Sequence, residues 1–168
     1  MNKSICTWLI LAALAAVVVC ENKSSIRQCK GQKFEDLQNR INVDACGSNK
    51  CKLVKKTNTT VSFRLKLANP SNDLVNDVHA VFGNLELPYV GVHGQSACAN
   101  IRRADTGEAA SCPLEAGVEY LYKNMFYIDP LFPEIPFIVR WSLKDQQNKD
   151  VLCFEVPAVI RKAKKKET

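Results

Sequence analysis

Two segments of the chain alternate apolar and polar residues with a period of two, and this pattern most strongly limits the possible fold. Residues 59–67 read TTVSFRLKL, and residues 135–144 read IPFIVRWSLK. Successive side chains of a β-strand point to opposite faces of a sheet, so each segment predicts a strand with one buried face. Within the second strand, Phe137, Val139 and Trp141 are expected on that face.

The rest of the chain supports an all-β fold. No window of a dozen residues carries the apolar stripe of a helix, and turn-forming runs occur at 69–73 (NPSND) and 145–150 (DQQNKD). Further strands are predicted over residues 75–82, 84–90, 118–128 and 151–160. Several short strands separated by turns are typical of an antiparallel β-sandwich.

The N-terminal segment has the features of a secretory signal peptide. Lys3 precedes the apolar run WLILAALAAVVV, and polar residues follow Cys20. The apolar stretch is shorter than the span of about 20 residues that crosses a bilayer. We predict cleavage after Cys20, with Ala16 as a weaker alternative, and a soluble domain over residues 21–160 followed by a basic tail over 161–168. The predicted location is extracellular, with the endosomal or lysosomal lumen as the second compartment.

Cysteines are abundant for a chain of 168 residues. Two of the eight lie in the predicted signal peptide, so six remain in the mature protein. An even number in a secreted domain predicts three disulfides, although six cysteines allow 15 connectivities. The spacings lack the paired C-x2-C units of structural zinc sites, so no metal and no cofactor are predicted.

The charged and catalytic residues favour a binding protein over an enzyme. The net charge of +6 is concentrated in the Lys-rich tail, without the aromatic-interleaved basic patch of nucleic-acid binders. His79 and His93 are the chain's two histidines, and neither belongs to a G-x-S-x-G or H-E-x-x-H motif. An enzyme acting on lipids is the rival class, and it would need a polar triad facing the cavity, for which the two histidines are the first candidates.

Residues 120–141 are the most distinctive segment of the chain. They hold seven of the thirteen aromatic residues and three of the seven prolines, which exclude a helix there. Two interpretations remain open. The large apolar side chains either plug the end of the sandwich or line the mouth of an apolar cavity.

Several motifs together resemble one family. These motifs are CGSNKC at 46–51, VHA at 78–80, LPYV at 87–90, CPLEAG at 112–117 and FPEIPFIVRWSLKDQQNKDVLCFEVPAVI at 132–160. They resemble the ML (MD-two-related lipid-recognition) family, and within it the Niemann-Pick type C protein two branch. The resemblance covers essentially the whole mature chain. This sequence departs from the family in a longer segment between Cys98 and Cys112 and in Phe154, where a Trp is common.

The resemblance implies an immunoglobulin-like β-sandwich whose two sheets separate to hold a lipid, with no catalytic residues. It also implies three disulfides, which are Cys29–Cys153, Cys46–Cys51 and Cys98–Cys112. A pocket-lining aromatic falls on Tyr89, and the two gate residues fall on Ile128 and Phe132. The remaining pocket positions are expected at Phe63, Leu65, Leu87, Tyr122, Phe126, Phe137, Val139 and Trp141.

The function implied is secreted lipid binding and transfer, with a sterol or a fatty acid as the ligand. The alternatives are recognition of bacterial lipids such as lipopolysaccharide and transport of a lipid-derived chemical signal. A membrane sterol transporter or a lipid-bearing membrane surface is the expected partner, and the protein is expected to be a monomer. Arg102 and Arg103 either meet an anionic headgroup or are solvated charges balanced by nearby carboxylates, the interpretation we favour. Asn58 and Asn22 lie in glycosylation sequons.

Overall fold

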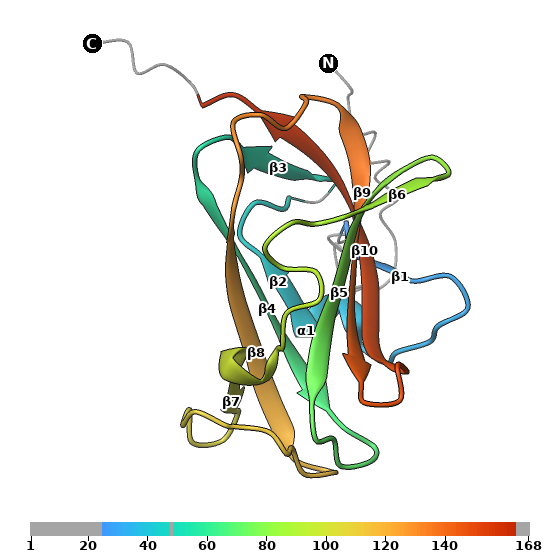
Figure 1. Ribbon diagram of the computed structural model, residues 1–168, viewed down its shortest axis with the longest axis vertical. Coiled ribbons are helices and arrows are strands. Elements are labelled where there is room, and N and C mark those ends of the chain that lie inside the picture. The colour runs from blue at the N-terminus through green and yellow to red at the C-terminus, as the bar shows by residue number, and fades with distance from the viewer. Residues whose placement is uncertain (1–24, 48, 164–168) are drawn as a thin grey trace, which may run out of the picture.

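A computed structural model describes residues 25–47 and 49–163, which form a β-sandwich (Figure 1). The predicted signal peptide, Asn22 and residues 164–168 of the basic tail lie outside the described residues. Within the described part, no helix has the length and apolar character needed to cross a membrane. The two helical elements there are α1 (Leu37–Arg40) and the 3-10 turn η1 (Cys98–Asn100).

The described strands form two sheets that pack face to face. The larger sheet has the order β1-β10-β9-β5-β6, with β3 also paired to β10, and the smaller has the order β2-β4-β8-β7. The strands of the larger sheet are β1 (Arg27–Gln28), β3 (Cys51–Val54), β5 (Leu74–Phe82), β6 (Leu85–Pro88), β9 (Pro136–Asp145) and β10 (Asp150–Arg161). Those of the smaller sheet are β2 (Ile41–Val43), β4 (Asn58–Lys66), β7 (Ile101–Arg103) and β8 (Glu119–Tyr127).

The strands predicted from alternation are confirmed, and so is the all-β sandwich. In β9, Phe137, Val139 and Trp141 are buried between the sheets, and Val61 and Phe63 are buried in β4. The strand predicted over 84–90 ends at Pro88, because the chain leaves it for a turn. Gly91 and Gly94 in that turn have positive φ angles of 86° and 77°, a conformation that glycine adopts without steric cost.

Four short strands were not predicted, and one of them changes the expected topology. Strands β1, β2, β3 and β7 span two to four residues, too few for a period to be recognised. Strand β3 pairs in parallel with β10, with Cys51 beside Ala158 and Val54 beside Arg161, so the sandwich is not wholly antiparallel. Its pairing depends on contacts between residues more than a hundred positions apart.

The described cysteines pair as Cys29–Cys153, Cys46–Cys51 and Cys98–Cys112, the pairs that the resemblance implies. Cys46 follows β2 in the smaller sheet and Cys51 begins β3 in the larger, so this disulfide joins the two sheets at one side of the sandwich.

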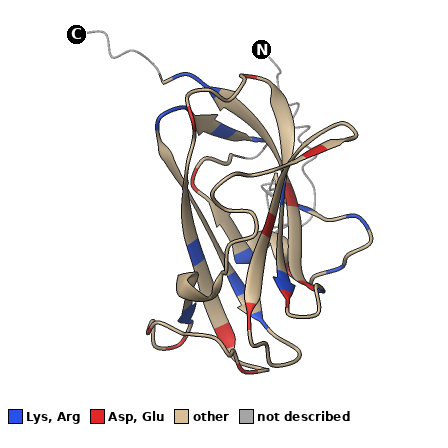
Figure 2. Cartoon of the chain, viewed as in Figure 1, with Lys and Arg blue, Asp and Glu red and all other residues tan. Residues whose placement is uncertain are grey.

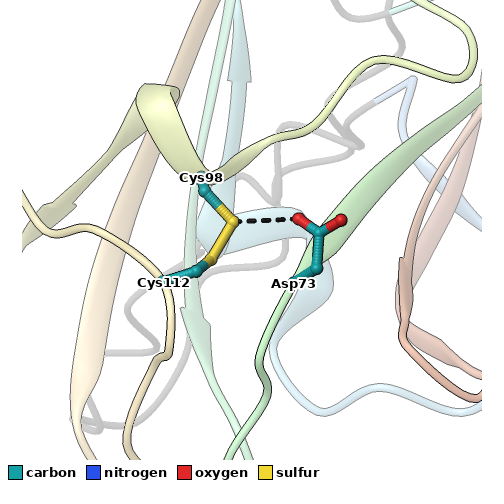
Figure 3. Close-up of side chains that lie close together, drawn as sticks. All are labelled: Asp73, Cys98 and Cys112. Atoms are coloured by element: carbon teal, nitrogen blue, oxygen red, sulfur yellow. Dashed lines mark hydrogen bonds between the residues drawn. A yellow bond between two sulfur atoms is a disulfide. The ribbon is translucent and has the colours of Figure 1, made fainter.

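The Cys98–Cys112 disulfide lies beside the carboxylate of Asp73, with Sγ of Cys98 at 3.1 Å from Oδ1 (Figure 3). Each sulfur is already bonded to another sulfur, so neither can act as a thiolate. The group of Asp73, Cys98 and Cys112 is therefore not a metal site.

The pairing gives the first testable expectation. Once residues 1–20 are removed, every remaining cysteine has a partner, so the mature secreted protein should contain no free thiol. Titration of denatured, unreduced protein with a thiol reagent should give no reaction. One reactive thiol per chain would indicate cleavage before Cys20, and two would indicate that one of the pairs does not form.

Candidate functional site

Three aromatic side chains from different parts of the chain meet at one place. Tyr89 follows β6, Phe126 lies near the end of β8, and Phe132 lies in the connection between β8 and β9. The ring centroid of Tyr89 is 5.4 Å from that of Phe126 and 5.7 Å from that of Phe132, both in edge-on geometry. This arrangement is favoured between aromatic rings because a positive ring edge meets a negative face. In Figure 1 the segment after β6 runs across the sandwich toward η1 and β7.

An open groove of about 500 Å³ lies on the outer side of these rings. Its lining is largely apolar, and Asp129 supplies its one charged side chain. The full lining consists of Tyr89, Val90, Gly91, Val92, Met125, Phe126, Tyr127, Asp129, Leu131 and Phe132. Two of these are among the most exposed apolar residues described, Leu131 at 89% and Val90 at 84%.

A second, small cavity lies on the inner side of Phe126, between the two sheets. It has a volume of about 20 Å³, and its lining is Val43, Cys51, Leu53, Val61, Phe126, Val139, Trp141, Phe154 and Val156. Strands β2, β4 and β8 of one sheet and β3, β9 and β10 of the other contribute these residues. Phe126 belongs to both linings, so its ring separates the solvent-accessible groove from the apolar interior.

Ring contacts continue from the groove into the core. The centroid of Phe126 lies 5.8 Å from that of Trp141, which stacks on Phe154 at 6.4 Å. Phe154 in turn lies 5.8 Å from Phe63. The interior beyond Phe126 is therefore bordered largely by flat, apolar ring surfaces.

A few polar groups are buried beside this aromatic path. The Tyr122 hydroxyl donates to Oδ1 of Asn76 at 2.7 Å and accepts from Nδ2 of Asn124 at 3.0 Å. Burial raises the pKa of Tyr122 far above its ordinary value, so this hydroxyl stays neutral. The Nε1 nitrogen of Trp141 is also buried, and within the described residues it has no hydrogen-bond partner.

Tyr89 connects the two sheets through its hydroxyl group. It donates a hydrogen bond to the backbone carbonyl of Tyr127 in β8 at 3.0 Å, while its own backbone N–H donates to the carbonyl of Val78 in β5 at 2.9 Å. Burial and the nearby carboxylate of Asp129 raise the pKa of Tyr89 to about 12. The phenol is therefore a neutral donor throughout the physiological pH range.

The structure brings five of the predicted pocket residues to these cavities and places the others elsewhere. Tyr89 and Phe132 line the groove, Val139 and Trp141 line the inner cavity, and Phe126 lines both. Phe63 and Tyr122 stack on each other in the adjacent core at 4.5 Å. Buried core positions outside both linings are occupied by Leu65, Phe137 and Ile128.

Two of the expected pocket positions have a different environment from the one anticipated. Leu87 is 46% exposed because β6 is a short edge strand beyond the reach of the opposite sheet. Ile128, expected as a gate residue, is fully buried at 0%. Its backbone N–H donates to the Thr57 carbonyl and its carbonyl accepts from Lys56, which hold it under the connection from β3 to β4.

Other lining residues were missed by the sequence prediction. Val61 lies on the alternating face of β4, and Phe154 and Val156 lie in the predicted last strand, so the apolar pattern contained a signal for these three. Val43, Cys51 and Leu53 lie in β2 and β3, which are too short to recognise, so the sequence contained no comparable signal for them.

The polar residues considered in the sequence lie away from the cavities. His79 lies on the outer face of β5, opposite to the buried face that carries Val78. Arg103 forms an ion pair with Asp105 at 3.3 Å, which agrees with the interpretation that these arginines are solvated charges balanced by nearby carboxylates. Asn58 is exposed at the start of β4. Figure 2 shows that basic and acidic residues are interleaved over both sheets and several loops.

Comparison with known proteins agrees with this architecture. The profile of the ML domain matches residues 23–160. The chain is 31% identical over 153 residues to NPC intracellular cholesterol transporter 2 homolog a of Drosophila melanogaster, covering 89% of this chain and 95% of that protein. It is 23% identical to the MD-2-related lipid-recognition protein of Manduca sexta, covering 92% and 97% of the two chains.

A solved structure shows the same fold. The Niemann-Pick type C2 protein from Japanese carpenter ant superposes with a TM-score of 0.61 at 20% identity, covering 72% of this chain and 89% of that one. Together with the family match over most of the chain, this fold identifies the protein as a member of the ML-domain family, in its Niemann-Pick type C2 branch.

Proposed function

We propose that the protein is a secreted lipid carrier that takes up a sterol or a fatty acid between its two sheets. The observation that carries this proposal is the position of Phe126, whose ring borders both the outer groove and the inner apolar cavity. Displacing this one ring joins the two spaces. The name of the Drosophila relative, a cholesterol transporter homologue, supports a sterol as the first ligand to test.

Ligand uptake requires the sandwich to open. The inner cavity of about 20 Å³ is far below the volume of about 300 Å³ or more that small-molecule sites provide. Besides the chain connections, the disulfide Cys46–Cys51 ties the two sheets at the β2–β3 side, whereas near the groove the side chains hold them by ring contacts and by the hydrogen bond from Tyr89 to Tyr127. Opening should therefore occur at Tyr89, Phe126 and Phe132, where only weak contacts must be broken.

The chemistry of the lining suits a neutral, mostly apolar ligand. Burial of apolar surface contributes about 25 cal/mol per Å² without directional requirements, so shape rather than charge selects the ligand. The unpaired Nε1 of Trp141 can donate to one oxygen atom of a sterol or fatty acid. For a sterol of about 28 heavy atoms, about 0.3 kcal/mol per atom gives a micromolar dissociation constant, a value compatible with release.

The rim of the groove provides a surface for delivery. Val90 and Leu131 project almost fully into solvent, and Met125 and Tyr127 beside them are also exposed. Exposed apolar clusters of this kind mark interaction sites. A lipid-bearing membrane surface or the apolar face of a membrane transporter could bind to this rim. A ligand that leaves past Phe126 would then pass directly into the partner without crossing water.

Recognition of bacterial lipopolysaccharide is a less favourable function for this groove. The phosphates of such a ligand are bound by Lys or Arg side chains at a pocket rim. The charged residue in the groove lining is Asp129, which would repel them. An enzymatic function is also less well supported, because His79 lies on the outer face of β5 and not toward the inner cavity.

Trp141 provides a direct test. Trp8, the other of the two tryptophans, lies in the predicted signal peptide, so Trp141 should be the only fluorescent indole of the mature protein. Because Trp141 lines the inner cavity, titration with a fluorescent sterol that accepts energy from tryptophan should quench it and saturate at one sterol per chain.

Competition separates the ligand classes. Unlabelled cholesterol and a long-chain fatty acid should reverse the quenching, whereas lipopolysaccharide should not. Failure of any sterol or fatty acid to give saturable quenching in folded protein would refute the proposed carrier function. Displacement by lipopolysaccharide alone would instead support the alternative.

A further inference from the structure

A cluster of three potential metal ligands lies on the outer face of the larger sheet, outside the linings of both cavities. It consists of Asp77, His79 and His93, whose ligand atoms all lie within 4.8 Å of one another. Nδ1 of His79 is 3.3 Å from Oδ1 of Asp77, and Nδ1 of His93 is 3.2 Å from the same oxygen. We propose that these three side chains form a binding site for Zn²⁺ or a chemically similar divalent transition metal.

Two of the three separations between ligand atoms match the requirements of such an ion. A tetrahedral zinc ion with bonds of about 2.0–2.1 Å holds its ligand atoms about 3.3–3.4 Å apart. Both nitrogen-to-oxygen distances differ from that separation by about 0.2 Å or less. Two imidazoles and one carboxylate are a common donor set for catalytic-type zinc sites, which leave the fourth position to water.

An unsatisfied nitrogen is a second, independent indication of a ligand. Nδ1 of His93 is buried, and among the described residues it has no hydrogen-bond partner, although it lies 3.2 Å from Oδ1 of Asp77. A buried polar atom without a partner destabilises the fold by about 1–3 kcal/mol, so such atoms are rare. A metal ion would accept its lone pair.

The backbone holds the three residues in place. Asp77 and His79 are two positions apart in β5, so they share one face of the strand. The turn that carries His93 is bonded to β5 on both sides, since Gly94 donates to the Asn76 carbonyl at 2.7 Å and Tyr89 donates to the Val78 carbonyl at 2.9 Å. The ligands are therefore largely preorganised.

The surrounding charges are compatible with a cation. Lys144 lies 3.5 Å from Oδ2 of Asp77, the oxygen that does not face the histidines, and 3.0 Å from Asp150, which balances its charge. Arg140, opposite His79 in the sheet, is paired with Glu86 and Glu155. Lys144 thus holds the second oxygen of Asp77 and orients the first toward the histidines, as outer-sphere groups do in known sites.

Titration of unreduced protein without a histidine tag tests the proposal. Isothermal titration calorimetry at neutral pH should show one Zn²⁺ bound per chain, and Mg²⁺ or Ca²⁺, which prefer oxygen ligands, should not compete. Replacement of either histidine, His79→Gln or His93→Gln, should weaken binding at least tenfold. The control Glu108→Gln, which removes an exposed carboxylate beside β7 in the other sheet, should leave binding unchanged.

Two further measurements separate loss of the site from loss of the fold. The three ligand side chains are partly exposed, at 22–37%, and lie outside the core, so the variants should melt within a few degrees of the wild type without metal and keep sterol binding within a few-fold. Zn²⁺ should raise the melting temperature of the wild type but not of the histidine variants, because it binds only the folded state. Absence of saturable Zn²⁺ binding by the wild type, or binding by both histidine variants as tight as that of the wild type, would overturn the proposed site.

Discussion

Phe126→Asp is expected to reduce sterol and fatty-acid affinity at least a hundredfold. The ring that is lost separates the groove from the inner cavity, so the new carboxylate would face the bound apolar ligand. Desolvating a charge against an apolar surface costs several kcal/mol, and a hundredfold loss corresponds to about 2.8 kcal/mol. In the unliganded protein, water in the groove can hydrate the carboxylate. Quenching of Trp141 by a fluorescent sterol measures the effect.

Three variants make this result interpretable. Leu85→Asp places the same charge at an exposed apolar residue outside both linings, and it should bind normally. Phe126→Leu keeps the wall apolar and should stay within a few-fold of the wild type. If Phe126→Asp is too unstable to study, Phe132→Asp places the charge at a partly exposed neighbour and should still reduce binding at least tenfold. If Phe126→Asp and Phe132→Asp each fold and each bind sterol normally, the proposed route of uptake is wrong.

Ile128→Asp is expected to destabilise the protein without acting on ligand binding directly. Ile128 is fully buried, and its backbone is bonded to Thr57 and Lys56, so the chain cannot turn a carboxylate toward water. An uncompensated buried charge reduces the free energy of unfolding by about 3–5 kcal/mol. Urea denaturation of ligand-free protein should therefore show a much lower midpoint.

The conservative variant Ile128→Val removes one methylene group and should reduce the free energy of unfolding by only about 1 kcal/mol. This pair of variants separates the two roles that the sequence left open for the segment. A stable Ile128→Asp protein that has lost sterol binding would show that Ile128 is a gate residue after all.

The long strands could be predicted because each contains its own evidence. Residues 59–67 and 135–144 alternate over enough positions to establish both the strand and its buried face, whatever the rest of the chain does. The family motifs around Cys46, Cys112 and Trp141 likewise identified the ML domain, because they fix residue types at particular spacings. Local patterns of this kind need no knowledge of distant contacts.

The positions of Phe126 and Ile128 show what local patterns leave open. The two residues are two positions apart, so alternation places both on the inner face of the same segment. The structure separates their environments: Phe126 borders the cavities, whereas Ile128 lies under the connection from β3 to β4. Which part of a strand's inner face borders a cavity depends on where the opposite sheet and its loops end.

The histidine cluster likewise depends on contacts between distant segments that local sequence patterns do not reveal. His79 and His93 appeared in the sequence as an isolated strand residue and an isolated loop residue, each without a metal-binding motif. The turn at residues 89–94 bonds back onto β5 and brings His93 beside Asp77. By itself, the sequence determined the long strands, their buried faces and the family, whose motifs also implied the disulfide pairs. Tertiary structure alone decided where the short strands pair and which side chains meet at the cavities and in the histidine cluster, because those contacts depend on how separate segments pack against one another.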